Sequence, residues 1–539
     1  MKLLMNIIIA KKHRLRSITL IILIIVFSCG EKKSNNENGN ITDSPSTGGT
    51  FHYSLDVKIT LDPHSVADTY SASVSNQIFE GLIEFDINTQ PIPALAESWI
   101  ISADRLKYTL FLRKGVEFHD GKVFNSRDVV YSLERVISSN TIGGMAAFDF
   151  LKKIKGAVEL KEGKADKLSG VEIIDSLTVI ITLTEPYPLF LMVLAMGPLK
   201  IISAGTEIKS EGNNRWKNVN GTGPFKYGGY DENENLTLLA NEDYHKGRPY
   251  LDSLIYMSDF NQDDDYPFEA FLKGERDMIG MPSGTDAISK IEGKYPMIVR
   301  PELSMEFIGI NSQIAPLNFQ EVRRALYIGL TGGKHGAVWG KWDIAAEGIV
   351  PIGMTGYIPR RREDPEETVE DIAAKFRKSH EGESWDVHFW STDTINTAKL
   401  TVILAQFNTK LNIHEVSWEE LTKRLIERRA DLWDLVWVAD MPDASSFIRS
   451  LFYSKSASNE FNYSNPTVDR LIEESERELN PEVRGQLIRQ IEDIILVDLP
   501  MIPIANYVNV YVLQPYVRGL QLSPLDISSV KFEEVWLTK

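Results

Sequence analysis

The sequence predicts an α/β protein with several lobes. Strand-like and helix-like patterns alternate along the 539 residues, and so long a chain exceeds what one hydrophobic core usually supports, so we expect two or three lobes. The single cysteine, Cys29, precedes the patterned part of the chain. We therefore expect no internal disulfide, and the stability of the lobes must come from their cores.

Residues 1–28 are typical of a secretory signal. A basic cluster from Lys11 to Arg16 precedes an apolar run over 18–27, which Ser28 and Cys29 follow. A small residue before cysteine resembles a bacterial lipobox. That resemblance implies cleavage before Cys29, lipidation of Cys29, and an extracytoplasmic protein held to a bacterial membrane, on the periplasmic side or at the cell surface. The alternative is an N-terminal membrane span, but the apolar run has about half of the ~20 residues needed.

The next segment, residues 29–49, predicts a disordered tether. It is rich in Asn, Ser, Gly and charged residues and has almost nothing to bury. A flexible chain of this length would reach about 25 Å.

Charge excludes one class of partner. The formal net charge is −17, and loss of residues 1–28, with five cations and no acid, would make the chain more negative still. Nucleic-acid binding needs clustered Lys and Arg, so we expect no nucleic-acid partner.

The elements of the first half follow from local patterns. Residues 106–112 alternate as a half-buried strand does, Asp120-Gly121 predicts a hairpin turn, and an apolar stripe from Val129 to Val136 predicts a helix after Ser126. Residues 236–240 and 254–257 predict further strands. Val322 to Ile328 predict a short helix.

The clearest helices lie near the C-terminus. Asn465-Pro466 and Asn480-Pro481 each combine an N-cap with a first helical residue. The second helix would bury one face and end before Pro500, and that face comprises Val483, Leu487, Ile488, Ile491, Ile494 and Ile495.

No catalytic motif is present. The chain has no HExxH zinc helix, no phosphate-binding loop and no GxSxG nucleophile, and its nine histidines never occur at ligand spacing. We expect no catalytic residue, no metal and no cofactor. A secreted hydrolase is the alternative from another class, and it would need a nucleophile or acid pair that the sequence does not reveal.

Five segments in order carry a resemblance. They are Pro93–Trp99 with Leu112–Gly121, Gly221–Phe225 with Asn241–Asp252, Gly309–Asn311 with Glu321–Leu326, Trp437–Asp443, and Asn462–Pro466 with Asp498–Pro503. Together they resemble the extracytoplasmic solute-binding proteins of peptide-type ABC importers, a family that includes oligopeptide-, dipeptide- and nickel-binding proteins. The resemblance covers about residues 50–520.

The resemblance implies a periplasmic-binding-protein-like clamp of two lobes with a hinge and an additional domain. Lobe I would comprise 50–85, 221–302 and 508–539, the additional domain 86–220, and the ligand-facing lobe 303–507. Crossings near 302 and 508 would form the hinge. The resemblance also implies a monomer that encloses a peptide and then docks on a membrane permease.

The same resemblance implies a set of ligand-binding residues. Asp440 would pair with the α-amino group of a peptide, Trp437 and Trp418 would form pocket walls, and the backbone of Val436 to Ala439, including Val438, would pair with the peptide. The bland alternatives are that Asp440 caps a turn before Pro442 and that the tryptophans pack in the core.

The chain departs from the family after Leu326. Four glycines between Gly329 and Gly336 stand where relatives continue a helix, and each should weaken a helix by about 1 kcal/mol. We therefore expect a reshaped loop there. The departure leaves open another solute, such as an oligosaccharide, a nickel complex or another small molecule. Arg323 is expected to form an internal ion pair.

Overall fold

The computed structural model describes residues 44–55, 58–212, 215–259, 265–282, 285–332, 342–360, 365–392 and 397–538. Cys29, the signal and residues 29–43 lie outside these ranges. Ser46, Gly48 and Gly49, predicted to belong to the tether, are ordered instead. Gly48 N donates to Tyr250 O at 2.7 Å, and Gly49 N donates to Asp252 Oδ2 at 3.1 Å.

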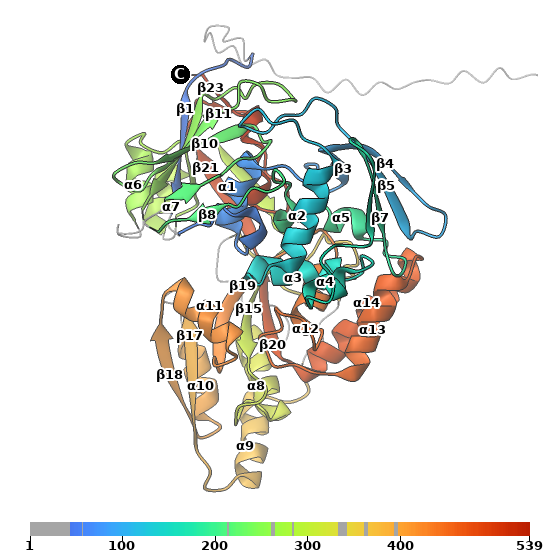
Figure 1. Ribbon diagram of the computed structural model, residues 1–539. Helices are drawn as coiled ribbons and strands as arrows, with labels where there is room; N and C mark the ends of the chain where they lie inside the picture. Colours follow the sequence, from blue (N-terminus) through green and yellow to red (C-terminus); the bar gives the residue numbers. More distant parts are fainter. Residues whose placement is uncertain are drawn as a thin grey trace, which may run out of the picture. The chain divides into compact units, whose positions relative to one another are not determined.

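The largest sheet has seven strands and is mixed, because β1 pairs in parallel with both of its neighbours while the other pairs are antiparallel. We call this sheet and its surroundings, residues 44–79, 202–301 and 508–538, the seven-stranded region (Figure 1). In spatial order the strands are β10 (Phe225–Tyr230), β11 (Leu236–Ala240), β12 (Ser253–Ser258), β1 (Thr50–Leu55), β13 (Met278–Gly280), β21 (Val508–Leu513) and β14 (Met297–Pro301).

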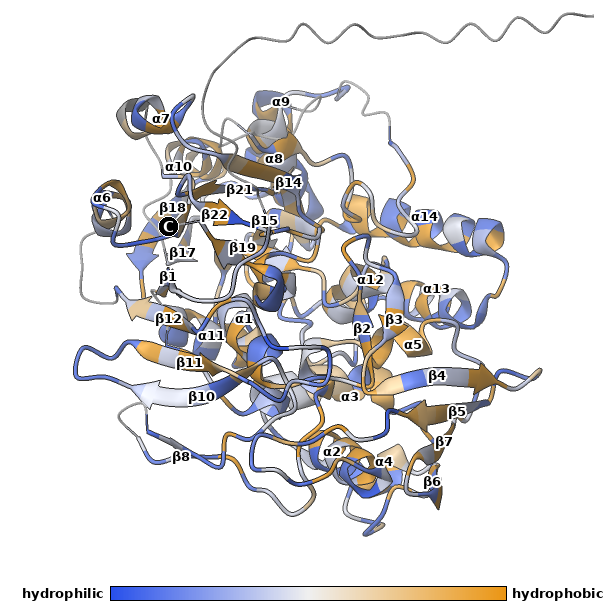
Figure 2. Ribbon diagram, turned by 90° about the horizontal axis from the view of Figure 1, so that it is seen from above, coloured by the Kyte–Doolittle hydropathy of each residue, from blue (hydrophilic) through white to orange (hydrophobic). Residues whose placement is uncertain are grey.

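A second sheet of four antiparallel strands belongs to residues 82–201, the four-stranded region. Its buried face packs against helices of the same segment, as the shared core of Leu110, Val129 and Phe150 shows. Figure 2 shows α2 and α4 beside this sheet. The strands in order are β4 (Ala96–Ile101), β5 (Lys107–Leu112), β7 (Thr178–Thr182) and β6 (Val171–Asp175), and the helices are α2 (Ser126–Ser138), α3 (Ile142–Leu151), α4 (Ala157–Lys161) and α5 (Phe190–Val193).

The third sheet has six strands and lies within residues 303–506, the six-stranded region. Hydrophobic clusters cover both of its faces, so the sheet is a buried layer between helices. In order the strands are β16 (Ile344–Ala345), β20 (Met501–Asn506), β15 (Ser304–Ile310), β19 (Leu432–Val438), β17 (Trp385–Ser391) and β18 (Thr409–Glu415).

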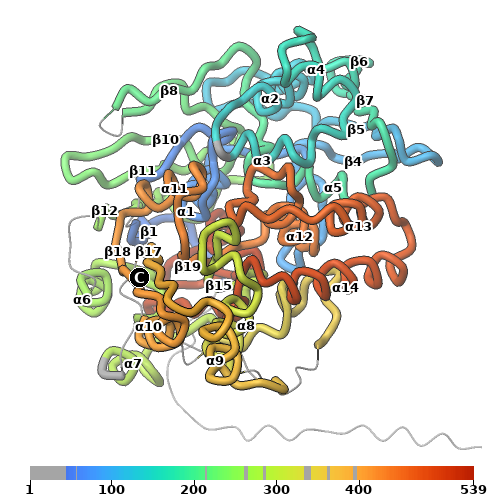
Figure 3. Tube along the Cα trace, turned by 90° about the horizontal axis from the view of Figure 1, so that it is seen from below, coloured from blue at the N-terminus to red at the C-terminus, as the bar shows by residue number. Residues whose placement is uncertain are grey.

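Helices on one face of this sheet are α8 (Gln320–Thr331), α9 (Val369–Ser379) and α10 (Ala398–Ala405), and those on the other are α11 (Trp418–Ile426), α12 (Ser445–Phe452), α13 (Pro466–Arg477) and α14 (Pro481–Asp498). Figure 3 shows α13 and α14 running side by side. The remaining elements are α1 (Thr69–Ile78), α6 (Tyr266–Leu272), α7 (Thr285–Ile291), and the small strand pairs β2 (Ile83–Phe85) with β3 (Pro91–Pro93), β8 (Lys209–Ser210) with β9 (Trp216–Lys217), and β22 (Val517–Arg518) with β23 (Trp536–Leu537).

The sheets correspond to the predicted segments. All seven strands of the largest sheet come from 50–85, 221–302 and 508–539, the four antiparallel strands from 86–220, and the six remaining strands from 303–507. The chain passes between the seven- and six-stranded sheets at 302–303 and at 507, and Glu302 N donates to Tyr507 O at 3.0 Å. The predicted domain limits and the hinge motion stay predictions.

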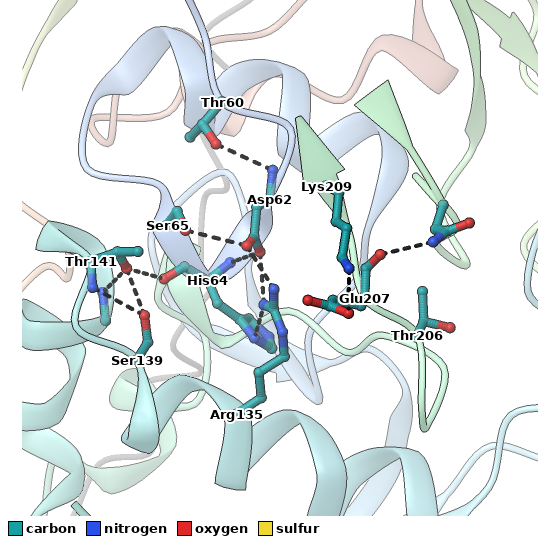
Figure 4. A network of polar contacts seen from close by, with 12 residues as sticks. Thr60, Asp62, His64, Ser65, Arg135, Ser139, Thr141, Thr206, Glu207 and Lys209 are labelled. Atoms are coloured by element: carbon teal, nitrogen blue, oxygen red, sulfur yellow. Dashed lines mark hydrogen bonds and ion pairs between the residues drawn. The ribbon is translucent and has the colours of Figure 1, made fainter. Parts of the chain in front are cut away.

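A polar network joins the seven-stranded region to α2 (Figure 4). Arg135 donates to both carboxylate oxygens of Asp62, at 2.8 and 2.7 Å, and to Nδ1 of His64 at 2.8 Å. His64 Nε2 donates to Lys200 O at 2.9 Å. Burial, and then the charge of Arg135, lower the pKa of His64 to about 4, so this histidine is neutral and its ring is held by both nitrogens.

Several local predictions are confirmed. Asn465 and Asn480 are the N-caps of α13 and α14, and Gly121 takes the left-handed conformation (φ 81°) in the hairpin turn. The helix predicted after Ser126 is α2, which begins one residue earlier than predicted, at Ser126, with Asn125 as its N-cap. The prediction of a buried apolar face on α14 is wrong for one residue, because Val483 is 40% exposed. It lies in the first turn, beyond the reach of the core.

Two other predictions are wrong. The helix predicted to stop before the glycines continues through Gly329 to Thr331 and ends at Gly332, whose φ is 65°. Arg323 does not rely on an ion pair, because its guanidinium donates to the carbonyl oxygens of Asp498 and Leu317 at 2.8 Å each. The residues 333–336 of the predicted loop lie outside the described ranges.

Candidate ligand-binding site

Strand β19 and the turn after it hold most of the predicted site. β19 pairs with β15 along its whole length, from Leu432 opposite Ile310 to Val438 opposite Ser304, and Ala439 N extends the ladder to Leu303 O at 2.9 Å. This pairing fixes the direction in which the chain leaves the sheet. Asp440 is therefore placed directly beyond the end of a rigid strand.

Only the first part of the other edge of β19 is paired with a neighbouring strand. β17 pairs with β19 at Leu432 and Trp433 alone, so the strand from Leu435 onward has no described neighbour strand on that side. Since Ala439 N bonds toward β15, the alternation of an antiparallel ladder turns the N–H and C=O groups of Val436 and Val438 toward the open side. Such an edge can accept an extended peptide as an added strand.

Helix α12 anchors the two ends of this segment. Ser446 Oγ accepts a hydrogen bond from Asp440 N at 2.8 Å, and Ser446 O accepts one from Trp437 Nε1 at 3.0 Å. Trp437 is half-buried against the core, and Ala439 is buried. The bonds from Ser446 fix the backbone at Asp440 without using its carboxylate.

The Asp440 carboxylate has no hydrogen-bond donor among the described residues. Its side chain is exposed to solvent, yet its desolvation by the protein around it raises its pKa to about 6. We interpret the two observations together as a carboxylate that water reaches from one side while protein surrounds the others. An unpaired carboxylate in such a place suits a cationic ligand group.

The alternative role predicted for Asp440, a turn cap, belongs to another residue. Asp443 is fully buried, and its carboxylate accepts a hydrogen bond from Ser445 N at 2.9 Å and two from Arg484, at 2.7 and 2.6 Å. Asp443 therefore stabilises the turn, and the Asp440 side chain does not take part in this stabilisation. The sequence offered no signal for Arg484, which lies 41 residues further along the chain.

Trp418 lies apart from the strand residues. It is the first residue of α11, capped by Ser417, and 45% of its surface is exposed. In the described part of the chain it makes no ring contact with Trp437. The structure thus brings Trp437, Val438, Ala439 and Asp440 together as consecutive residues, and leaves Trp418 as an exposed aromatic surface on a neighbouring element.

Two histidines that the sequence shows as unrelated are paired. His388 Nδ1 and His414 Nε2 lie 2.7 Å apart on β17 and β18, and Trp390 stacks on His414 at 4.1 Å. Sequence spacing could not reveal this pair because the two strands are parallel and 26 residues separate the partners. Within the described ranges, no group of three or more His, Cys, Asp or Glu side chains could hold a metal ion.

No helix of the described residues combines the length and the apolar character that a membrane crossing requires. The described residues form three large sheets in separate regions, and the candidate site lies at the end of strand β19.

Sequence comparison finds the bacterial extracellular solute-binding proteins of family 5 over residues 90–459. Heme-binding protein A of Haemophilus influenzae is 28% identical over 93% of this chain and 95% of its own. The periplasmic oligopeptide-binding protein OppA of Escherichia coli is 26% identical over 86% and 88%. Helicobacter pylori DppA in complex with the peptide STSA shares the fold, with a TM-score of 0.77, 23% identity, and 92% and 99% of the chains covered. The chain belongs to the family 5 bacterial extracellular solute-binding proteins.

Proposed function

We propose that this chain is the extracytoplasmic substrate-binding lipoprotein of an ABC transporter. It captures peptides between its lobes and delivers them, as a monomer, to the membrane permease. Lipid on Cys29 holds it to the membrane. It carries out no reaction of its own.

The observation that carries the proposal is the combination of a free strand edge with an unpaired carboxylate. The open edge of β19 at Val436 and Val438 suits main-chain groups, which every peptide shares. Asp440, at the end of that edge, suits the α-amino group, which every unblocked peptide carries. Neither contact depends on the identity of the peptide side chains. The arrangement therefore suits a protein that binds peptides of many sequences.

Two findings on relatives support the choice of cargo. OppA of Escherichia coli is named an oligopeptide-binding protein, and the Helicobacter pylori structure contains the peptide STSA. Trp418 and Trp437 would supply flat, rigid walls for varied side chains.

A non-peptide solute is the second candidate. The observation in its favour is that the relative with 28% identity is named a heme-binding protein. An oligosaccharide and a nickel complex are the other non-peptide candidates. Asp440 has no cationic partner among the described residues, and this favours a ligand that carries a positive group.

The test compares a tripeptide that has a free amino terminus with its N-acetylated form by calorimetric titration. We expect acetylation to weaken binding to the unaltered protein at least tenfold, because it removes the charge that Asp440 meets. In Asp440→Asn the two peptides should bind alike, and in the matched control Asp166→Asn, an exposed aspartate of the four-stranded region, the difference should persist.

Equal binding of both peptides to the unaltered protein would overturn the role of Asp440. If no peptide binds at all, mass spectrometry of the ligand that accompanies the protein through purification identifies the second candidate directly. Mass analysis of the mature N-terminus, with the Cys29→Ser variant beside it, tests the lipid.

A further inference from the structure

Buried charges line the boundary between the four-stranded and six-stranded regions. Lys153, two residues after α3, is 7% exposed, and its Nζ lies 2.6 Å from Glu185 Oε1 and 3.0 Å from Glu476 Oε2 on α13. Glu476 is 1% exposed and Arg449 on α12 is 3% exposed. A boundary inside one permanent core would be expected to be apolar, because charges taken from water cost free energy.

Each buried charge of this boundary keeps a partner within its own region. Lys153 and Glu185 both belong to the four-stranded region. Glu476 and Arg449 both belong to the six-stranded region, where Arg449 Nη1 lies 2.9 Å from both oxygens of Glu476. Separation of the two regions would therefore break the Lys153–Glu476 contact without leaving any of these four groups unpaired. The energetic penalty that usually prevents the parting of buried ions is absent.

Several further contacts across this boundary are polar as well, beside the apolar contacts of Met441 and Phe85. Arg477 Nε lies 2.5 Å from Glu185 Oε2, and Ala457 N donates to Asp149 Oδ2 at 3.1 Å. Lys152 pairs with Asp149 at 2.9 Å and lies 5.4 Å from the centre of the Tyr453 ring. Polar contacts can exchange with water when surfaces part, whereas an exposed apolar surface cannot be compensated in this way.

The boundary adjoins the ligand-binding turn. Met441, the residue after Asp440, is fully buried in the hydrophobic cluster of the four-stranded region, although it belongs to the chain of the six-stranded region. Asp443, two residues later, is held by Arg484. Contact between the two regions and the placement of Asp440 are thus mechanically linked through residues 440–443.

We infer that Lys153, Glu185, Glu476 and Arg477 form a reversible electrostatic latch that stabilises the closed arrangement of the two regions, with or without a ligand between them. The inference rests on the proposed clamp function, because only a protein whose lobes separate needs a latch. In the open state Lys153 stays with Glu185 and Glu476 stays with Arg449. In the closed state Lys153 joins both carboxylates, and Arg477 adds a second bridge at the rim.

The test measures the distance between the two regions without any ligand. Cys29→Ser removes the only cysteine of the full chain, so cysteines introduced at Val123 and Val402, 58% and 62% exposed, give unique sites for nitroxide labels. Pulsed EPR then gives the distribution of distances. We expect Lys153→Gln to lower the population at the shorter distance at least threefold, and the matched control Lys155→Gln, an exposed neighbour, to leave it unchanged.

A second variant guards against misfolding. Arg477 is half-exposed at its side chain, so Arg477→Gln should fold and should shift the distances in the same direction as Lys153→Gln, though less. If the distributions of both variants superimpose on that of Lys155→Gln, the latch does not exist. Because no ligand takes part, the outcome is independent of the peptide titration: a protein that opens on Lys153→Gln but binds no peptide retains the latch and loses the proposed cargo.

Discussion

At the scale of single residues, Asp440 and Asp443 show how neighbouring carboxylates of one turn acquire different tasks. Asp443 is buried and satisfied by Arg484 and Ser445, so it stabilises the turn. Asp440 has no described donor, and desolvation raises its pKa to about 6. The difference arises from the tertiary partner of each, since both belong to the same short segment of sequence.

Under the proposed function, the raised pKa of Asp440 predicts that peptide binding depends on pH. Only the carboxylate attracts an ammonium group, and with a pKa of about 6 Asp440 is ~90% ionised at pH 7 and ~10% at pH 5. The dissociation constant of an unblocked peptide should therefore rise about tenfold from pH 7 to pH 5, measured by titration calorimetry. Asp440→Asn should bind weakly with no change over this range, and a tenfold change in that variant would assign the titration to another group.

The same shift affects stability with the opposite sign. Because the folded state holds the Asp440 proton more tightly than the unfolded chain does, the free energy of unfolding falls as the pH rises from about 4 to above 6. At neutral pH the ionised Asp440 therefore lowers the free energy of unfolding of the protein without ligand. A cationic ligand would relieve this cost by favouring the carboxylate.

At the scale of elements, α8 shows a packing requirement that outweighs helix propensity. Gly329 lies inside the helix, and a methyl group there would lie 2.4 Å from Ile403 Cδ1 on α10 and 3.3 Å from Val369 Cγ2 on α9. β15 has a similar feature, since a methyl group on Gly309 would lie 2.1 Å from the ring of Trp433, its cross-strand partner. These glycines are needed for close approach between elements.

Gly329→Ala should accordingly destabilise the protein. Propensity alone would add about 1 kcal/mol of stability, but overpacking costs about 1–3 kcal/mol, so we expect a net loss of about 1 kcal/mol in urea unfolding. Ile403→Val removes the obstructing methyl group. The double variant should therefore lose less stability than the sum of the losses measured for the two single variants. A stabilising Gly329→Ala would show that propensity dominates.

At the scale of the whole folded part, residues 45–539, the connections between regions come from segments far apart in sequence. The chain passes twice between the seven- and six-stranded sheets, at 302–303 and at 507, and these crossings are hydrogen-bonded to each other. Met441 links the six-stranded region to the core of the four-stranded region. Two crossings side by side are the arrangement that the predicted hinge requires, and the hinge motion itself stays a prediction.

Met441→Ala should weaken both regions that Met441 connects. Truncation of a buried methionine costs about 2–4 kcal/mol, and we expect a loss of this size in urea unfolding. Hydrogen exchange should accelerate at α3 and at α12 together, because the side chain is buried in the core of the four-stranded region while the chain leads on into α12 at Ser445. The exposed Val402→Ala should change neither measurement. Faster exchange at α12 alone would mean that Met441 does not couple the regions.

The sequence by itself determined the fold class and many elements, because period-two and helical patterns, Asn-Pro caps and a Gly turn act within a few residues. It also pointed to Trp437–Asp440 as one segment, since these residues are consecutive. Only the tertiary structure decided that β17 leaves part of the edge of β19 unpaired. It also decided that Arg484 donates hydrogen bonds to Asp443 and not to Asp440, and that His388 contacts His414. Strand order, desolvation and partners dozens of residues away depend on how distant segments pack, and no local pattern encodes that packing.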